Sequence, residues 1–277
     1  MSSLLPHARL APRRRARLIT LLTVALTTGL AAALTLVPAA AQAATTCSSG
    51  ASEGMNPYYI LDNEYNSSLA TSSSWQCVWS TSQSGNTIVW GADWDWAHAS
   101  SSTSSDVLAY PAAVLGWEWG WQYSDTKLPV RLSSGTTVSS TWNYTFTQNT
   151  SNTFDVSYDN WITSSSDPGD ANPQAEMMIW LNHGGGAGPA GSQEATVSVD
   201  GASWNLYVDT DNTWPIYSFV RTSTTTSSSL TITDFTKVLT GSYGLNSSYY
   251  LSSVQAGVEV WTGEGQIDSN SYSVTVG

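Results

Sequence analysis

Short runs of hydrophobic residues recur along the chain, separated by segments rich in Ser, Thr, Gly, Asn and Asp. Many short runs with turn-forming residues between them are typical of a β-sandwich or β-barrel. The predicted strands are 86–90, 107–115, 141–148, 153–163, 175–181, 194–199, 202–207, 214–221, 230–233, 253–261 and 271–276. One short helix is predicted near 234–240. The pattern therefore indicates an all-β chain with a single domain and no appended binding module.

Two of the predicted strands place a glutamate on the face opposite an unbroken apolar face, since successive strand side chains point to opposite sides of a sheet. In the run 175–181 the odd-numbered residues are apolar, and Glu176 shares the other face with Met178 and Trp180. The run 254–261 repeats this design, with Glu259 near Trp261. A solvated carboxylate is the more common outcome for one such strand. Two glutamates placed in the same way in strongly apolar runs indicate a functional cleft.

A third run, 154–162, places Asp155, Asp159 and Trp161 on the face opposite its apolar residues. Cleavage of a glycosidic bond needs a proton for the leaving oxygen and help for an oxocarbenium-like centre, and two facing carboxyl groups provide both. At about 5–5.5 Å apart, one carboxylate attacks the anomeric carbon and the configuration is retained. Adjacent strands give roughly this spacing between facing side chains. We therefore expect Glu176 and Glu259 to face each other, with Asp159 holding the nucleophile in place.

The first 43 residues have the pattern of a secretory signal peptide. Four arginines within 13–17 precede an apolar run at 18–38, and Ala41-Gln42-Ala43 is a small-x-small cleavage site. We expect export by the general or the twin-arginine route and cleavage after Ala43, which leaves 44–277 as a single secreted catalytic domain. An N-terminal membrane anchor is the alternative. No other segment is apolar enough to span a bilayer.

The chain has 9 basic and 21 acidic residues and a formal net charge of −12. After 1–43 is removed, the basic residues are Lys127, Arg131, Arg221 and Lys237. A strongly acidic surface disfavours nucleic acid and anionic lipid but tolerates a neutral polysaccharide. The 14 Trp and 13 Tyr residues suit the apolar faces and hydroxyl edges of sugar rings, although large sandwiches also use aromatic residues in their cores. We therefore expect a neutral polysaccharide as the partner and no nucleic acid.

Cys47 and Cys77 are the only cysteines. In an oxidising compartment we expect them to pair, with two free buried thiols as the alternative. The only histidines after residue 43, His98 and His183, show no metal-ligand spacing. We therefore expect no metal ion and no organic cofactor.

Several strings resemble glycoside hydrolase family 12. The strongest are Glu176-Met177-Met178-Ile179-Trp180-Leu181 and Gln255-Ala256-Gly257-Val258-Glu259, which are similar to the family's two active-site strands. Tyr110-Pro111 followed by Gly116, the segment 185–189 and the last run 271–276 also fit the family. The resemblance spans Cys47 to Gly277. It implies a β-jelly-roll sandwich of two antiparallel sheets with a concave substrate cleft, and endo-acting, retaining cleavage of β-1,4-linked glucans.

The resemblance also implies roles for individual residues. Glu176 matches the nucleophile, Glu259 the acid/base, and Asp159 the acid that hydrogen-bonds the nucleophile. The resemblance implies Tyr65, Met178, Trp180 and Pro189 as substrate-binding residues, and we also expect Trp96 and Trp261 to bind substrate. The segment 62–66 departs from the family's frequent Asn-Asn-x-Trp-Gly pattern, so that Tyr65 stands where a sugar-stacking Trp is expected at the non-reducing end. The three indoles of 117–121 resemble family members that act on xyloglucan.

The sequence does not rank cellulose, mixed-linkage β-glucan and xyloglucan, and a xyloglucan-specific endoglucanase is one alternative. A non-catalytic carbohydrate-binding sandwich is another, since it would need the aromatic residues but not two facing glutamates. A xylanase of the related jelly-roll family is disfavoured by the string that follows Glu176. We expect the protein to be a monomer that leaves the membrane once the signal is cleaved.

Overall fold

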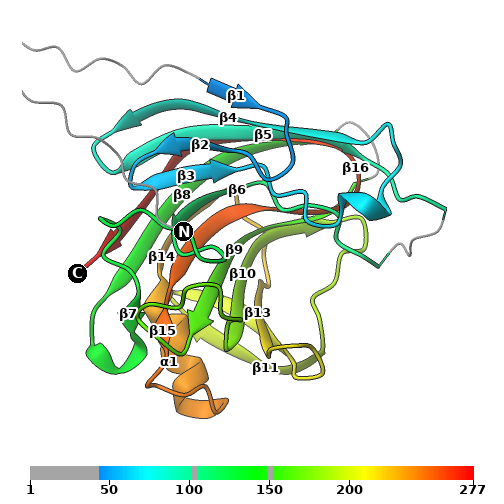
Figure 1. Cartoon of the computed structure of the whole chain (residues 1–277). Helices are drawn as coiled ribbons and strands as arrows, with labels where there is room; N and C mark the ends of the chain where they lie inside the picture. Colours follow the sequence, from blue (N-terminus) through cyan, green and yellow to red (C-terminus); the bar gives the residue numbers. More distant parts are fainter. Residues whose placement is uncertain (1–43, 101–104, 149–151) are drawn as a thin grey trace, which may run out of the picture. The chain divides into compact units, whose positions relative to one another are not determined.

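The computed structural model describes residues 44–100, 105–148 and 152–277, and the predicted signal peptide lies outside these residues. Strands dominate the described part, as predicted (Figure 1). The strands of the first half are β1 (Ala44–Thr46), β2 (Ser52–Met55), β3 (Tyr58–Leu61), β4 (Trp75–Ser84), β5 (Thr87–Trp96), β6 (Ala112–Gly116), β7 (Val130–Arg131) and β8 (Val138–Gln148). Those of the second half are β9 (Thr153–Thr163), β10 (Ala175–Gly184), β11 (Ser192–Val199), β12 (Ala202–Asp209), β13 (Ile216–Arg221), β14 (Ser227–Thr231), β15 (Tyr250–Leu251) and β16 (Ser253–Val276). The helical elements are η1 (Ser67–Leu69), η2 (Leu132–Ser134) and α1 (Ile232–Ser242).

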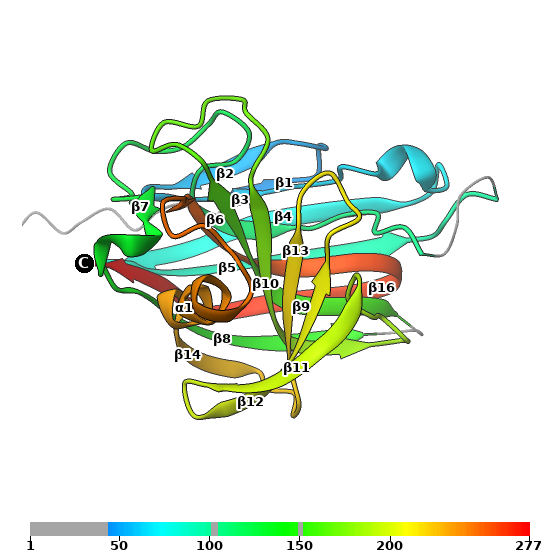
Figure 2. The same ribbon diagram turned by 90° about the horizontal axis from the view of Figure 1, so that it is seen from below.

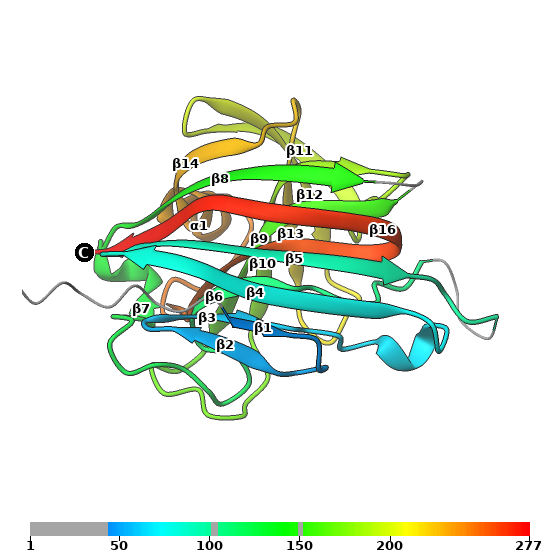
Figure 3. The ribbon, with the colours of Figure 1, turned by 90° about the horizontal axis from the view of Figure 1, so that it is seen from above.

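The strands form two layers. The outer layer has the order β1-β4-β5-β16-β8-β14, and Figure 3 looks down on it. The inner layer has the order β2-β3-β6-β16-β9-β10-β13-β12-β11. All of these pairings are antiparallel except that of β10 with β13, which is parallel. The predicted sandwich is therefore confirmed, with one parallel pair inside the inner layer.

The longest strand, β16, belongs to both layers. Residues 253–262 of β16 pair with β6 and β9 in the inner layer, and 263–276 pair with β5 and β8 in the outer layer. Figure 1 shows this ribbon turning from one layer into the other at one side of the molecule. The sequence predicted two separate strands here, at 253–261 and 271–276. The polar, glycine-containing stretch between them is in fact the bend, where Gly263 has a φ of 103°.

The main core lies between the two layers. Alternate residues of the inner strands enter it, including Val156, Tyr158, Met177, Ile179 and Val258, each of which is 0% exposed. Burial of apolar surface on this scale is the main favourable contribution to folding. The opposite face of the same strands is thereby left for other side chains.

The α-helix α1 closes the core beside β8 (Figure 2). Its Phe235 packs edge-to-face on Trp204 of β12 and Phe219 of β13, with ring centroids 5.1 and 5.0 Å away. The sequence predicted this helix at 234–240, and it extends over Ile232–Ser242. It lies on the core side of the inner layer and leaves the opposite face open.

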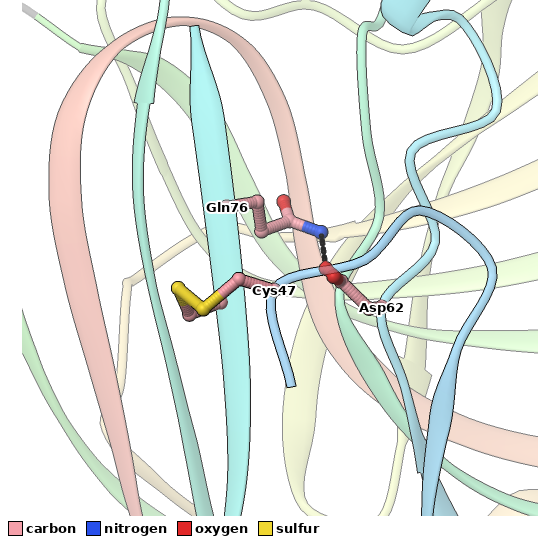
Figure 4. The surroundings of a disulfide bond; sticks show 4 residues. Cys47, Asp62 and Gln76 are labelled. Atoms are coloured by element: carbon pink, nitrogen blue, oxygen red, sulfur yellow. Dashed lines mark hydrogen bonds between the residues drawn. A yellow bond between two sulfur atoms is a disulfide. The ribbon is translucent and has the colours of Figure 1, made fainter. Parts of the chain in front are cut away.

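Cys47 and Cys77 form the predicted disulfide, which ties the segment after β1 to β4 (Figure 4). Next to it, Gln76 Nε2 donates a hydrogen bond of 2.7 Å to Oδ1 of the buried Asp62. Asp62 also exchanges backbone hydrogen bonds with Gly50 and Ala51. These contacts fix the chain just before Asn63 and Tyr65, two residues that line the cavity described below.

Candidate active site

Three neighbouring strands of the inner layer, β16, β9 and β10, carry acidic side chains on the face that points away from the core. Glu176 lies opposite Trp161, and Glu259 lies opposite Asp155. Between these two levels, Asp159 lies opposite Met178 on one side and Gln255 on the other. The alternation predicted for these three runs is therefore correct.

Glu176 and Glu259 are not on adjacent strands, contrary to the expectation from spacing, because β9 lies between β10 and β16. Glu176 pairs near the end of β9, at Trp161, whereas Glu259 pairs near its start, at Asp155. The inner strands are curved (Figure 1), and both glutamates line one cavity. The cavity is about 410 Å³. It is lined by Asn63, Tyr65, Tyr110, Glu118, Trp119, Asp159, Trp161, Glu176, Trp214, Gln255 and Glu259.

The carboxyl groups of this cavity hold protons more tightly than free carboxyl groups do. Burial raises the pKa of Glu176 and that of Asp155 to about 7. Burial, reinforced by the surrounding negative charges, raises the pKa of Asp159 and of Glu259 well above the usual range. Several carboxylates packed this closely in a low dielectric cannot all be ionised. At neutral pH the site therefore contains both protonated and ionised carboxyl groups.

Asp155 and Glu259 form a carboxyl pair across β9 and β16. Burial and the neighbouring charge of Asp155 raise the pKa of Glu259 well above its usual range, which favours the protonated form of Glu259. Asp155 is 0% exposed, so its charge is not screened by water. Of the two glutamates, Glu259 is thus the one suited to carry a proton to a ligand.

Glu176 has a different environment. Its Oε2 accepts a hydrogen bond of 3.0 Å from the indole Nε1 of Trp214, in the segment just before β13. A donor to a carboxylate favours the ionised form and therefore opposes the effect of burial. Asp159 is 7% exposed, and burial followed by the neighbouring charge of Glu176 raises its pKa well above the usual range, so Asp159 tends to be the protonated member of that pair. Of the two glutamates, Glu176 is the one suited to act as a nucleophile.

A further carboxyl group, the half-buried Glu118, contacts side chains of two of the site's strands. Its Oε2 accepts hydrogen bonds from Trp161 Nε1 at 3.0 Å and from Gln255 Nε2 at 2.5 Å. Burial raises its pKa to about 7. The carboxyl group thus attaches the segment after β6 to the floor of the cavity.

Among the predicted substrate-binding residues, Tyr65 is in the cavity and is 53% exposed. An exposed aromatic ring on a cavity wall is suited to stacking on a sugar. Neighbouring backbone hydrogen bonds hold its segment in place, from Tyr110 N to Asn63 O at 2.8 Å and from Asn66 N to Leu108 O at 3.1 Å. Tyr65 therefore lies on the wall of the cavity, and its contact with a sugar stays a prediction.

The prediction for Trp96 is wrong. Its side chain is 2% exposed and belongs to the main core, so no ligand can reach it. Its Nε1 donates a hydrogen bond of 3.2 Å to Gln76, which in turn holds Asp62. The cause is its position on β5 in the outer layer, where its side chain points inward.

Met178, Trp180 and Trp261 do share the face of the two glutamates, but they are only 4%, 1% and 7% exposed. They pack together with Val220 in a small apolar cluster of their own. The half-buried Pro189 belongs to the loop whose Ala187 covers that cluster. Met178, Trp180 and Trp261 therefore form packed structure beside the cavity rather than open stacking surfaces, and the role of Pro189 stays a prediction.

Sequence reasoning missed Asp155, Glu118, Trp119, Trp161, Trp214 and Gln255 as site residues. Asp155 and Trp161 were recognised on the correct face of β9, and the signal for them was the acid-and-Trp pattern of that run. The dense indoles of 117–121 were the signal for Trp119. Trp214 had no local signal, since its partner Glu176 is 38 residues away in the chain.

Across 44–100, 105–148 and 152–277, no group of three or more His, Cys, Asp and Glu side chains is placed to hold a metal ion. In the same ranges no helix is long and apolar enough to cross a membrane.

A sequence model described as "Glycosyl hydrolase family 12" matches residues 56–277. A curated relative from Neosartorya fischeri, named a probable xyloglucan-specific endo-beta-1,4-glucanase A, is 39% identical over 252 residues, which are 89% of this chain and 98% of the relative. Endoglucanase S from Pectobacterium parmentieri is 37% identical over 231 residues, which are 80% of this chain and 83% of the relative. The solved family 12 xyloglucanase from Bacillus licheniformis superimposes with a TM-score of 0.74 at 34% identity, covering 84% of this chain and 100% of the other. The carboxyl-lined cavity, the fold and these similarities agree: the chain belongs to glycosyl hydrolase family 12.

Proposed function

We propose that the protein is a secreted endo-β-1,4-glucanase that acts by a retaining, double-displacement mechanism. The observation that carries the proposal is the unequal pair of glutamates in one cavity. Glu259 is held protonated by Asp155, whereas Glu176 is held toward the ionised form by Trp214. Unequal environments of this kind separate a general acid from a nucleophile.

In the first step Glu176 attacks the anomeric carbon through Oε1, since Oε2 is occupied by Trp214. Glu259 gives its proton to the leaving glycosidic oxygen, and a glycosyl–enzyme ester forms. In the second step the ionised Glu259 takes a proton from water, whose oxygen attacks the same carbon and releases Glu176. Asp159 holds the orientation of Glu176 during both steps.

The substrate class follows from the relatives and from the charge. Relatives over most of the chain are named endoglucanases and xyloglucan-specific endoglucanases. A net charge of −12 and a cavity lined by carboxyl groups disfavour acidic polysaccharides and suit a neutral β-1,4-glucan. Xyloglucan is the first substrate to test, ahead of mixed-linkage glucan and cellulose.

We also propose that the protein is exported by its N-terminal segment and acts outside the cell as a monomer. The disulfide between Cys47 and Cys77 supports this location, since such bonds persist in oxidising compartments.

Reducing ends released in parallel from xyloglucan, barley β-glucan, carboxymethylcellulose and xylan test the activity and its specificity. Proton NMR of the first products tests the stereochemistry, since retention gives β-anomers before mutarotation. Cleavage of xylan alone, or α-anomers as first products, would contradict the proposal.

A further inference from the structure

The segment Trp117–Trp121 forms a tight hairpin at the edge of the cavity. Glu118 and Trp121 exchange both backbone hydrogen bonds, at 2.9 and 3.1 Å, around the central residues Trp119 and Gly120. Both central residues have a positive φ, 38° for Trp119 and 88° for Gly120. This is the sign pattern of a type I′ turn, whose first central position favours Asn, Asp or Gly.

A tryptophan at this position is strained, because a bulky side chain disfavours the left-handed region. Strained residues persist when their surroundings fix them, and they gather at functional sites. Only the bulky indole distinguishes Trp119 from the residues that this turn prefers. The strain therefore points to a use for the side chain itself.

The surroundings do fix the hairpin from two sides. Trp117 Nε1 donates a hydrogen bond of 2.7 Å to Gly169 O, and a Cβ on Gly120 would come within 2.0 Å of Asp170 Oδ1. On the other side, the half-buried Glu118 carboxyl group accepts hydrogen bonds from Trp161 of β9 and Gln255 of β16. The hairpin is thus attached directly to the strands that carry the acidic residues.

The Trp119 side chain lines the cavity and is 42% exposed. One of its faces stacks on Trp117, with ring centroids 5.3 Å apart and planes inclined by 23°. Its neighbours in the cavity are Trp161, edge-to-face at 5.0 Å, and Trp214 at 6.0 Å. Trp214 is the residue that binds Glu176, so the exposed indole stands beside the nucleophile.

We propose that the strained turn presents Trp119 as a stacking platform for one glucosyl ring of the substrate, on the wall of the cavity that carries Glu176, and that Glu118 is a positioning residue that holds the platform. This inference rests on the proposed glucanase function and adds a specificity-determining contact to it. An indole face matches the axial C–H groups of a β-linked glucose, whereas the hydroxyl groups of the sugar remain free for polar contacts.

The test measures cellotetraose binding by calorimetry to the full chain in a Glu176→Gln background, where cleavage is blocked. Trp119→Gly removes the ring and relieves the positive φ, so its melting temperature should not fall. We expect the dissociation constant to rise about tenfold in Trp119→Gly and less in Trp119→Phe. Trp75→Ala, which removes an indole that is also 42% exposed but outside the cavity lining, should leave binding unchanged.

Glu118 is tested in the same background. Glu118→Ala should weaken binding as Trp119→Gly does, and Glu118→Gln, which keeps an acceptor for Trp161 and Gln255, should restore it. Unchanged binding in a folded Trp119→Gly chain would overturn the inference and leave the proposed function standing. If the Glu176→Gln chain with Trp119 intact binds no glucan and the parent cleaves none, the proposed function fails and the inference with it.

Discussion

Trp214 donates its indole N–H to Oε2 of Glu176 across 3.0 Å, from the segment just before β13, the strand that pairs in parallel with β10. This single neutral donor opposes the burial that raises the pKa of Glu176 to about 7. The contact therefore controls how much of the nucleophile is ionised at acidic and neutral pH.

Trp214→Phe should raise the pKa of Glu176 further, because the ionised form loses its donor. Since Glu176 must be ionised to attack, the acidic limb of the kcat/KM profile should move to higher pH. Below pH 7, kcat/KM should fall about tenfold or more, the effect of one hydrogen bond to a charged group. Trp75→Phe is the matched control on an indole that does not line the cavity. An acidic limb that stays in place in Trp214→Phe would show that this hydrogen bond does not tune the nucleophile.

Asp155→Asn should act on the opposite limb. Besides burial, the charge of Asp155 raises the pKa of Glu259, so that the loss of this charge lowers the pKa of Glu259. Glu259 must be protonated for the first step, and the alkaline limb of kcat/KM should therefore move to lower pH. If only the acidic limb of the kcat/KM profile moves in Asp155→Asn, Asp155 acts on a group other than Glu259.

The stability of the fold should also depend on these carboxyl groups. A carboxyl group whose folded pKa is raised binds its proton more tightly in the folded state, so its contribution is present below the unfolded pKa of about 4 and is lost as pH rises through the folded value. Asp155, Glu176 and Glu118 all have a pKa of about 7 in the fold. The free energy of unfolding should therefore fall between about pH 4 and pH 7.

Glu118→Gln removes one of these titrations while keeping a hydrogen-bond acceptor. Its free energy of unfolding in urea should exceed that of the parent at pH 8 by about 1–3 kcal/mol and match it at pH 4. Glu194→Gln, on an exposed glutamate, should show no such pH-dependent gain. A constant difference between Glu118→Gln and the parent at both pH values would contradict the account.

The disulfide should contribute strongly to stability, since it closes a loop between residues 30 apart in sequence. Replacing Cys47 and Cys77 together by Ala should lower the free energy of unfolding by about 3.6 kcal/mol. Urea unfolding of the double variant beside the oxidised parent measures this. A loss below about 1 kcal/mol would mean that the unfolded chain gains little freedom from opening this loop.

The sequence predicted the inner strands well because their alternation is strict. The run 153–163 coincides with β9, and the faces of β9, β10 and β16 are those expected. The prediction from sequence missed β4, because residues 80–84 of this strand are all Ser, Thr or Gln and so show no hydrophobic alternation. The continuity of β16 was hidden in the same way by its polar middle.

The candidate site was predictable only in part. Glu176, Glu259 and Asp159 could be found because each breaks an apolar run, whereas Trp96 looks the same in sequence whether its ring faces the core or the cleft. The carboxyl pair of Asp155 and Glu259 depends on strand order, which places β9 between β10 and β16. Contacts that join distant segments, such as Trp214 to Glu176, follow from the fold and not from any local pattern.

The central claim is that Glu176 is the nucleophile of a glucanase. The most direct measurement follows reducing ends released from xyloglucan and barley β-glucan by the purified parent protein and by its Glu176→Ala variant, with folding checked by circular dichroism. We expect the parent to cleave at least one glucan and the folded variant to lose about 10⁴-fold or more of that rate, as nucleophile removal does in other covalent mechanisms. A folded Glu176→Ala variant that cleaves as fast as the parent would contradict this claim.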